Sequence, residues 1–237
     1  MALGRTTAGR RTVSLEEGAV PGGARCPACG APLFVWVETE GWGPREDQEI
    51  DRCENCGLAV PRDSVPDPDR AASELIGSET PDAQGRLVMR LANAASVQAW
   101  LGAENWAALH VGENDLKPSP RAAELLLAKC GLGVSGVRHL AGPGMAAMWQ
   151  TLLNLLTFHR NFAPEALSGR LRPAGGRGRG AYAIDVMVTV LAAIPTAIIA
   201  AVVEGGAVLA KRGGVIEVRA EPLPGEDAQP ALPDQNT

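Results

Sequence analysis

The sequence predicts an α/β chain in which a small β module, called here the cysteine module (residues 25–60), precedes a larger α/β domain. Three observations support this prediction. Two short cysteine motifs frame the module, and strand-forming residues lie between them. From Arg86 to Leu140, segments typical of a strand, a helix and a second strand follow one another, which is the order of an α/β domain. The 237 residues are enough for one small module and one ordinary domain.

The cysteine motifs read Cys-Pro-Ala-Cys-Gly and Cys-Glu-Asn-Cys-Gly, with twenty-two residues between them. Each motif bends back on itself and presents both sulfurs to one side, so the pair predicts a tetrahedral zinc site with Cys26, Cys29, Cys53 and Cys56 as ligands. A site made of four cysteines is closed to substrate, so we expect structural zinc. The glycine after each second cysteine suits a tight turn that needs positive φ.

Between the motifs, Leu33–Thr39 is predicted as a strand, Gly41–Pro44 as a turn and Gln48–Arg52 as the returning strand, which makes a zinc ribbon. Two other interpretations compete with it. Disulfides would need a secreted protein, but the first 25 residues contain four arginines and no apolar segment. A redox Cys-x-x-Cys would account for one motif and not for both. We therefore expect a reducing compartment, the cytoplasm.

The remaining chain divides by composition. Residues 1–24 are predicted as a disordered arm, 61–84 as a linker with a short helix, 85–220 as the α/β domain and 221–237 as a disordered acidic tail. Three prolines between Pro61 and Pro68 predict an extended linker that decouples the two folded parts.

Within the α/β domain, Arg86–Leu91 is nearly continuously apolar, which is typical of a strand in a mostly parallel sheet. Ser119 and Pro120 predict the start of a helix that Gly131 closes. The further expected elements are helical spacing over Ala95–Trp106, a strand at Val134–Leu140, a helix at Met145–Phe158 and a last strand at Val215–Arg219.

Residues 170–209 are a candidate for peripheral membrane contact. Four arginines lie in a glycine-rich stretch expected to be a loop, Leu167–Gly180, and Val186–Val203 carries no charge. The other interpretation is a solvated loop followed by buried helices. Pro195, which is expected to kink or divide the helix, and the acids at 185 and 204 argue against a membrane span.

A family resemblance rests on residues 85–132. From Gly85 the sequence reads Gly-Arg-Leu-Val-Met-Arg-Leu-Ala-Asn-Ala-Ala-Ser, and Trp106, Leu109, Ser119-Pro120 and a helix ending Lys-Cys-Gly-Leu follow. This pattern resembles the carboxyl half of class I S-adenosylmethionine-dependent methyltransferases of the type 11 kind. The resemblance extends more weakly to the last strand, over roughly residues 70 to 220. It implies a shortened Rossmann-like fold. Some members of that family carry an amino-terminal zinc-binding module, in agreement with the predicted ribbon.

The departures from the family concern its cofactor and its acid–base chemistry. Such enzymes bind the cofactor in an amino half of about a hundred residues, with a glycine-rich loop and an acidic residue, and residues 61–84 leave no room for it. S-adenosylmethionine is therefore a doubtful ligand. The family's Pro before Asn93 is Ala92 here, His110 stands at its usual Asp and Asn114 at its usual His. We assign no catalytic residue, and the substrate-pocket candidates are Asn93, Trp106, His110 and Asn114. The alternative for Asn93 is a turn residue that caps the next helix.

These observations predict a degenerate, methyltransferase-like zinc-binding protein that acts as a binding or accessory module, with a protein partner or a second copy of itself. Two alternatives stay open: a methyltransferase completed by a partner chain or a dimer, and a peripheral membrane adaptor. The balance of 27 acidic against 22 basic residues argues against a dedicated nucleic-acid binder, whose affinity would depend on neutralising phosphates.

Overall fold

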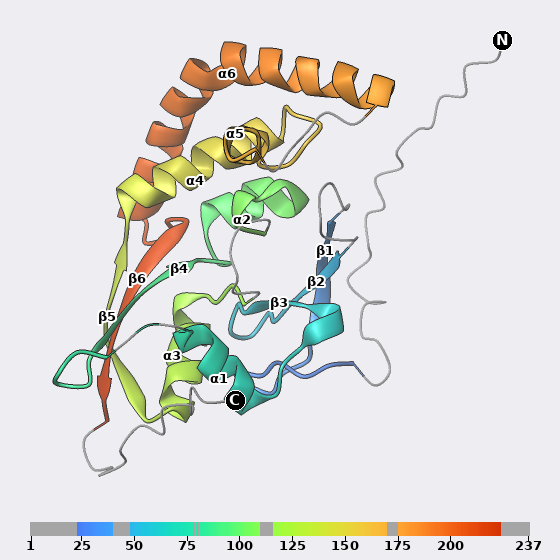
Figure 1. Cartoon of the computed structure of the whole chain (residues 1–237). Helices are drawn as coiled ribbons and strands as arrows, with labels where there is room; N and C mark the ends of the chain where they lie inside the picture. Colours follow the sequence, from blue (N-terminus) through green and yellow to red (C-terminus); the bar gives the residue numbers. More distant parts are fainter. Residues whose placement is uncertain are drawn as a thin grey trace.

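The computed structural model describes residues 23–39, 48–77, 79, 81–109, 116–169 and 175–223. These residues form a mixed α/β fold with two three-stranded antiparallel sheets (Figure 1). Most of the expected terminal arm and tail lies outside the described residues, as does the expected turn at 41–44.

The cysteine module contains the first sheet, with strands β1 (Phe34–Thr39), β2 (Gln48–Arg52) and β3 (Ala59–Pro61) in that order. The antiparallel pair β1–β2 confirms the two predicted strands, and the register shifts between Val35 and Val37. The sequence does not predict β3, because three residues are too few to show an alternating pattern. A bridge from Ala59 to Lys117 connects β3 to the larger part of the chain.

The expected extended linker, Pro61–Pro68, contains a 3-10 turn, η1 (Arg62–Ser64), and the short helix expected within residues 61–84 is α1 (Pro68–Ile76). Asp67 caps α1, since its side chain accepts hydrogen bonds from the N–H groups of residues 69 and 70. The helix buries Ala71, Ala72 and Leu75 and packs against α3 (Pro120–Lys129). The linker is therefore largely folded onto the rest of the chain.

The second sheet contains β4 (Leu87–Ala92), β5 (Leu132–His139) and β6 (Val215–Pro222) in the order β4-β6-β5. β6 runs antiparallel to both neighbours, so the expectation of a mostly parallel sheet is wrong. The apolar run in β4 suggested burial on both faces, yet its side chains alternate between buried and exposed, and Val88 is 51% exposed. One face of this strand is open, as antiparallel sheets allow.

Short helices connect these strands. They are α2 (Val97–Gly102), two 3-10 turns, η2 (Ala103–Asn105) and η3 (Ala107–Leu109), the helix α3, then α4 (Ala141–Asn154) and α5 (Phe162–Leu167). Ser96 and Ser119 cap α2 and α3 by accepting a hydrogen bond from the N–H three residues on. The predicted cap at Ser119 is confirmed, and Gly131 follows α3 with φ of 70°.

Helix α6 (Gly175–Leu209) is one helix of 35 residues that contains Pro195. The expectation of a loop up to Gly180 is thus wrong from Gly175 onward. Figure 1 shows α6 bending as it passes over α4 and α5, as expected of a helix that lacks one N–H. Helices α4 and α6 pack against each other, and Trp149 Nε1 donates to the carbonyl of Ala193, 3.0 Å away, beside the proline.

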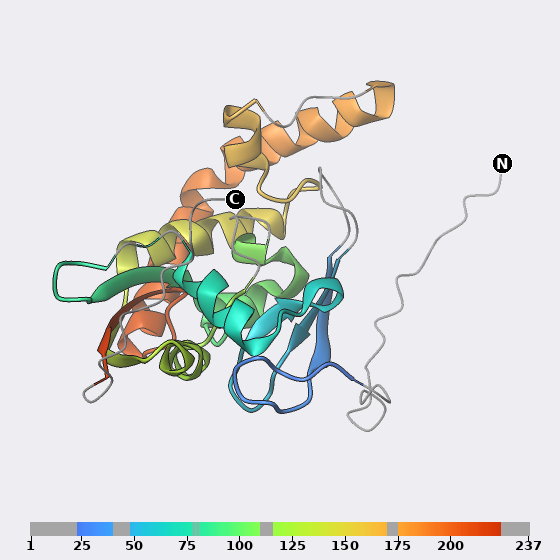
Figure 2. The same ribbon diagram turned by 60° about the horizontal axis from the view of Figure 1, so that its bottom comes forward.

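One apolar core runs through the cysteine module and the larger part of the chain. It joins Leu33 and Leu58 of the module to Met89, Leu126 and Ile216. A smaller cluster joins the first sheet to the η2–η3 region around Trp106. The expectation that the two parts are decoupled is therefore wrong. Figure 2 shows the first sheet lying beside the helices in a second view.

Candidate metal centre

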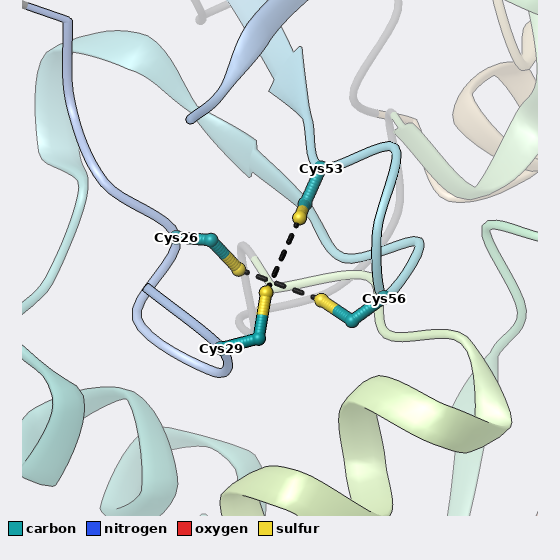
Figure 3. A group of neighbouring side chains, drawn as sticks. All are labelled: Cys26, Cys29, Cys53 and Cys56. Carbon is teal, nitrogen blue, oxygen red and sulfur yellow. Dashed lines mark hydrogen bonds between the residues drawn. The ribbon is translucent and has the colours of Figure 1, made fainter. Parts of the chain in front are cut away.

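The four cysteine sulfurs point toward one centre (Figure 3). Cys26 Sγ lies 3.5 Å from Cys56 Sγ, Cys29 Sγ lies 3.5 Å from Cys53 Sγ, and all four sulfurs lie within 4.8 Å of one another. A tetrahedron with metal–sulfur distances of about 2.3 Å has edges of about 3.8 Å, so this spacing fits a tetrahedral site with four thiolate ligands. A disulfide would need about 2.05 Å, and the thiols are free. The cluster can hold a metal ion and is compatible with structural zinc.

Each cysteine motif closes with the same backbone turn. The N–H of Gly30 donates to the carbonyl of Cys26, and the N–H of Gly57 donates to the carbonyl of Cys53, both at 2.8 Å. The two glycines have φ of 73° and 75°, a conformation that other residues rarely adopt, so the predicted reason for glycine is confirmed.

Helix α3 holds the second cysteine motif in place. Ser119 Oγ donates to the carbonyl of Cys56 and accepts from the N–H of Ala122, so one hydroxyl caps the helix and binds the motif. A Cβ at Gly57 would lie 3.0 Å from Ser119 Cβ, a contact so tight that Ser119 would have to shift. The metal centre is thus fastened to the larger part of the chain.

A hydrogen bond joins the thiols of Cys26 and Cys56 and shifts their pKa values in opposite directions. The pKa of Cys26 is lowered to about 5, chiefly because its thiolate accepts a hydrogen bond from Cys56 Sγ, and the N–H groups of Cys29 and Ala28 lower it further. The pKa of Cys56 is raised, first by that same hydrogen bond and then by burial. Burial also raises the pKa of Cys53. The lowered pKa of Cys26 favours the thiolate form that binds a metal cation, and binding of a cation would displace the protons that remain on the other thiols.

Asn93 follows the end of β4 and is 1% exposed. Its Nδ2 donates to the carbonyl of Gly213, and its Oδ1 accepts from the N–H of Ala95, both at 3.0 Å. The side chain thus fixes the turn after β4 to the strand that follows α6. This is the role of a turn residue, the alternative to a ligand contact, but the cap of the next helix is Ser96 and not Asn93.

Trp106 is fully buried between the two parts of the chain and packs edge-on against Trp36, with ring centroids 6.0 Å apart. Its Nε1 has no hydrogen-bond partner among the described residues. His110 and Asn114 lie outside the described residues. A shallow cavity of about 480 Å³ lies elsewhere, and neither Asn93 nor Trp106 lines it. Its lining residues are Pro120, Val137, His139, Val208 and Lys211.

Sequence reasoning used the two acids of α6, Asp185 and Glu204, only as evidence against a membrane span and did not predict that both are buried. Asp185 accepts hydrogen bonds from the N–H groups of Phe158 and His159 and lies 2.6 Å from His159 Nδ1. Glu204 accepts from Gln98 Nε2 at 2.7 Å and from the N–H of Gly214 at 2.8 Å. The sequence did carry a signal, because an acidic side chain inside an apolar helix needs hydrogen-bond partners when it is buried. The sequence could not identify those partners, since they lie up to 106 residues away along the chain.

By length and composition, Arg179–Leu209 within α6 could cross a membrane, and 11% of its most apolar eighteen-residue window is buried. No protein-family model, curated protein or solved structure matches the chain.

Proposed function

We propose that this protein is a degenerate, methyltransferase-like accessory module in which a structural zinc ion holds the cysteine module against a shortened α/β domain, and which does not itself transfer methyl groups. The observation that carries the proposal is that the side chain of Asn93, one of the substrate-pocket candidates, is hydrogen-bonded to backbone groups. Asn93 stands where the family resemblance places a strand end near substrate, yet both polar atoms of its side chain are used in holding the backbone.

Zinc suits the cysteine cluster because its four thiolate ligands leave no open coordination position. Bound there, the ion would supply folding free energy and no reaction step. Cys26, Cys29, Cys53 and Cys56 would hold it, and Ser119 would orient the second pair of ligands through the Cys56 carbonyl.

Isothermal titration of the purified, zinc-loaded chain with S-adenosylmethionine tests the non-catalytic role. We expect no heat of binding, because the resemblance begins after the cofactor half of the family. Saturable binding at one site per monomer would overturn the proposal.

A second candidate function is a methyltransferase completed by another chain. It is favoured by the outer edge of β4, which pairs with β6 on one side and with no described strand on the other. Light scattering of the same sample during the titration separates the two candidates. S-adenosylmethionine binding that appears only in a dimer supports completion by a second copy.

A further inference from the structure

Helix α6 presents a row of apolar side chains to the outside of the molecule. Val190, Ile194, Ile198 and Val202 recur every four residues and so lie on one face of the helix. They are 61–74% exposed, which is unusual for four consecutive positions of one helical row.

The acidic residues of this helix point the other way. They are Asp185 and Glu204, and both are buried against the protein with hydrogen-bonded partners. A helix that faces water buries its apolar residues and exposes its charges. Along this part of α6 the polarity is reversed, so the outward face suits a non-aqueous environment.

Other exposed apolar residues lie near α6. Helix α4 contains no charged residue, and Leu155, Leu156 and Phe158 beyond its end are about half exposed. Leu167, at the end of α5, is 90% exposed. In Figures 1 and 2 these three helices gather at one end of the molecule, away from the first sheet. These residues and the row on α6 are together called the α4–α6 face.

Cations lie near both ends of α6. Arg179 near its start and Lys211 just beyond its end are both exposed, and Lys211 also lines the cavity beside β5. Long basic side chains at the ends of an apolar helix reach the phosphate region of a bilayer while the apolar residues enter the acyl region. The pattern of charge therefore complements a phospholipid surface.

The inner side of α6 is fastened along its length. Asp185 accepts a hydrogen bond from the N–H of Phe158 in the segment after α4. Trp149 Nε1 donates to the carbonyl of Ala193 and to Thr196 Oγ1. Glu204 accepts from the N–H of Gly214, just before β6. A helix that crossed a bilayer alone would lose these contacts. The fastening therefore keeps α6 on the surface of the domain.

We propose that the α4–α6 face docks on a phospholipid bilayer, with α6 lying in the plane of the interface rather than spanning the membrane. This proposal does not depend on the methyltransferase resemblance. It commits to lipid as the occupant, because the face has an uncharged centre and basic ends.

Flotation of the full-length, zinc-loaded protein with vesicles tests the docking. One set contains phosphatidylcholine and the other contains phosphatidylcholine and phosphatidylglycerol in equal parts. We expect binding to both and tighter binding to the anionic set, and Ile194→Asp should lower the partition coefficient about tenfold or more. Val88→Asp is the matched control, since Val88 is also exposed but lies in β4, and it should leave binding unchanged.

Zinc content and circular dichroism of both variants verify folding, since both side chains are at least half exposed. The proposal is overturned if the folded wild-type chain floats with neither vesicle, or if Ile194→Asp binds as well as wild type. A soluble dimer that Ile194→Asp separates, with no flotation, would show that a second copy covers the face. Retention on vesicles after alkaline carbonate washing would show a span.

Discussion

At the residue scale, the cysteines are distinguished by position. Cys26, Cys29, Cys53 and Cys56 converge, whereas Cys130 lies apart at the end of α3, partly buried, with a pKa raised by burial. The first four are expected to act together and Cys130 to act as a small apolar residue.

Metal analysis of two variants checks this distinction. We expect one zinc ion per wild-type chain, near-complete loss in Cys53→Ser and full retention in Cys130→Ser. The physical reason is that a structural zinc ion contributes on the order of 10 kcal/mol and depends on all four ligands. Equal zinc content in both variants would rule out the assigned ligand set.

The lowered pKa of Cys26 gives the site a defined response to acid. Because this pKa falls from 9.0 to about 5 in the folded chain, the thiolate stabilises the fold fully above pH 9.0, and this contribution is lost as the pH falls toward about 5. Zinc should accordingly be held most firmly above pH 9.0 and be released progressively as the solution is acidified toward about pH 5. A dye that binds released zinc, read during a pH titration, measures this. Zinc that stays bound when the pH falls below about 5 would contradict it.

Ser119 joins the metal centre to α3 through one hydroxyl. Ser119→Ala removes the helix cap and the hydrogen bond to Cys56, so we expect a loss of unfolding free energy on the order of 1 to 2 kcal/mol. Urea unfolding measures it. Ser135→Ala is the control, because that exposed hydroxyl makes only a 3.4 Å contact to Arg219. Equal effects of the two substitutions would mean that Ser119 has no special role.

At the element scale, α6 is held by its buried acids as well as by apolar packing. Asp185 is fully buried and satisfies two backbone N–H groups in the segment after α4. Its pairing with His159 fixes where the long helix lies after α5.

Asp185→Ala should therefore destabilise the chain by roughly 2 to 4 kcal/mol, because two N–H groups and an imidazole lose their acceptor. Thermal unfolding of the zinc-loaded protein measures the loss. Asp82→Ala serves as the exposed comparison and should cost far less, since its contacts to Arg86 and Gln84 lie in solvent. A small effect of Asp185→Ala would show that α6 is held by apolar contacts alone.

At the scale of the whole molecule, the shared core would make a metal ion bound by the four cysteines a determinant of the stability of the whole chain. Leu33 and Leu58, each of which follows one of the cysteine motifs, pack in the same cluster as α1, α3 and the second sheet. Unfolding of the cysteine module would expose the apolar surface of α1, α3 and the second sheet that packs against it.

Chelation should therefore reduce hydrogen-exchange protection in α1 and α3 as well as in residues 25–60. Amide exchange measured with and without chelator, against the Cys130→Ser variant as a control that keeps its zinc, follows this element by element. Loss confined to residues 25–60 would instead support independent folding of the cysteine module, as the proline-rich sequence alone predicted.

The sequence by itself determined what depends on neighbours along the chain. The doubled cysteine motif, its glycines and the cap at Ser119 are local features, because a tight turn or a helix start is specified within a few residues. The first strand of the module was predicted from its strand-forming residues and the last strand of the chain from its alternation, and both signals are visible within a few residues.

Tertiary structure alone decided how these elements meet. The insertion of β6 between β4 and β5, the shared core and the partners of Asp185 and Glu204 join residues far apart in sequence. An apolar run specifies burial and not direction, so β4 alone could not reveal an antiparallel neighbour. In the same way, the composition of α6 could not show which of its faces would be covered by protein. That depends on where α4 lies and on its hydrogen bond from Trp149 to the carbonyl of Ala193.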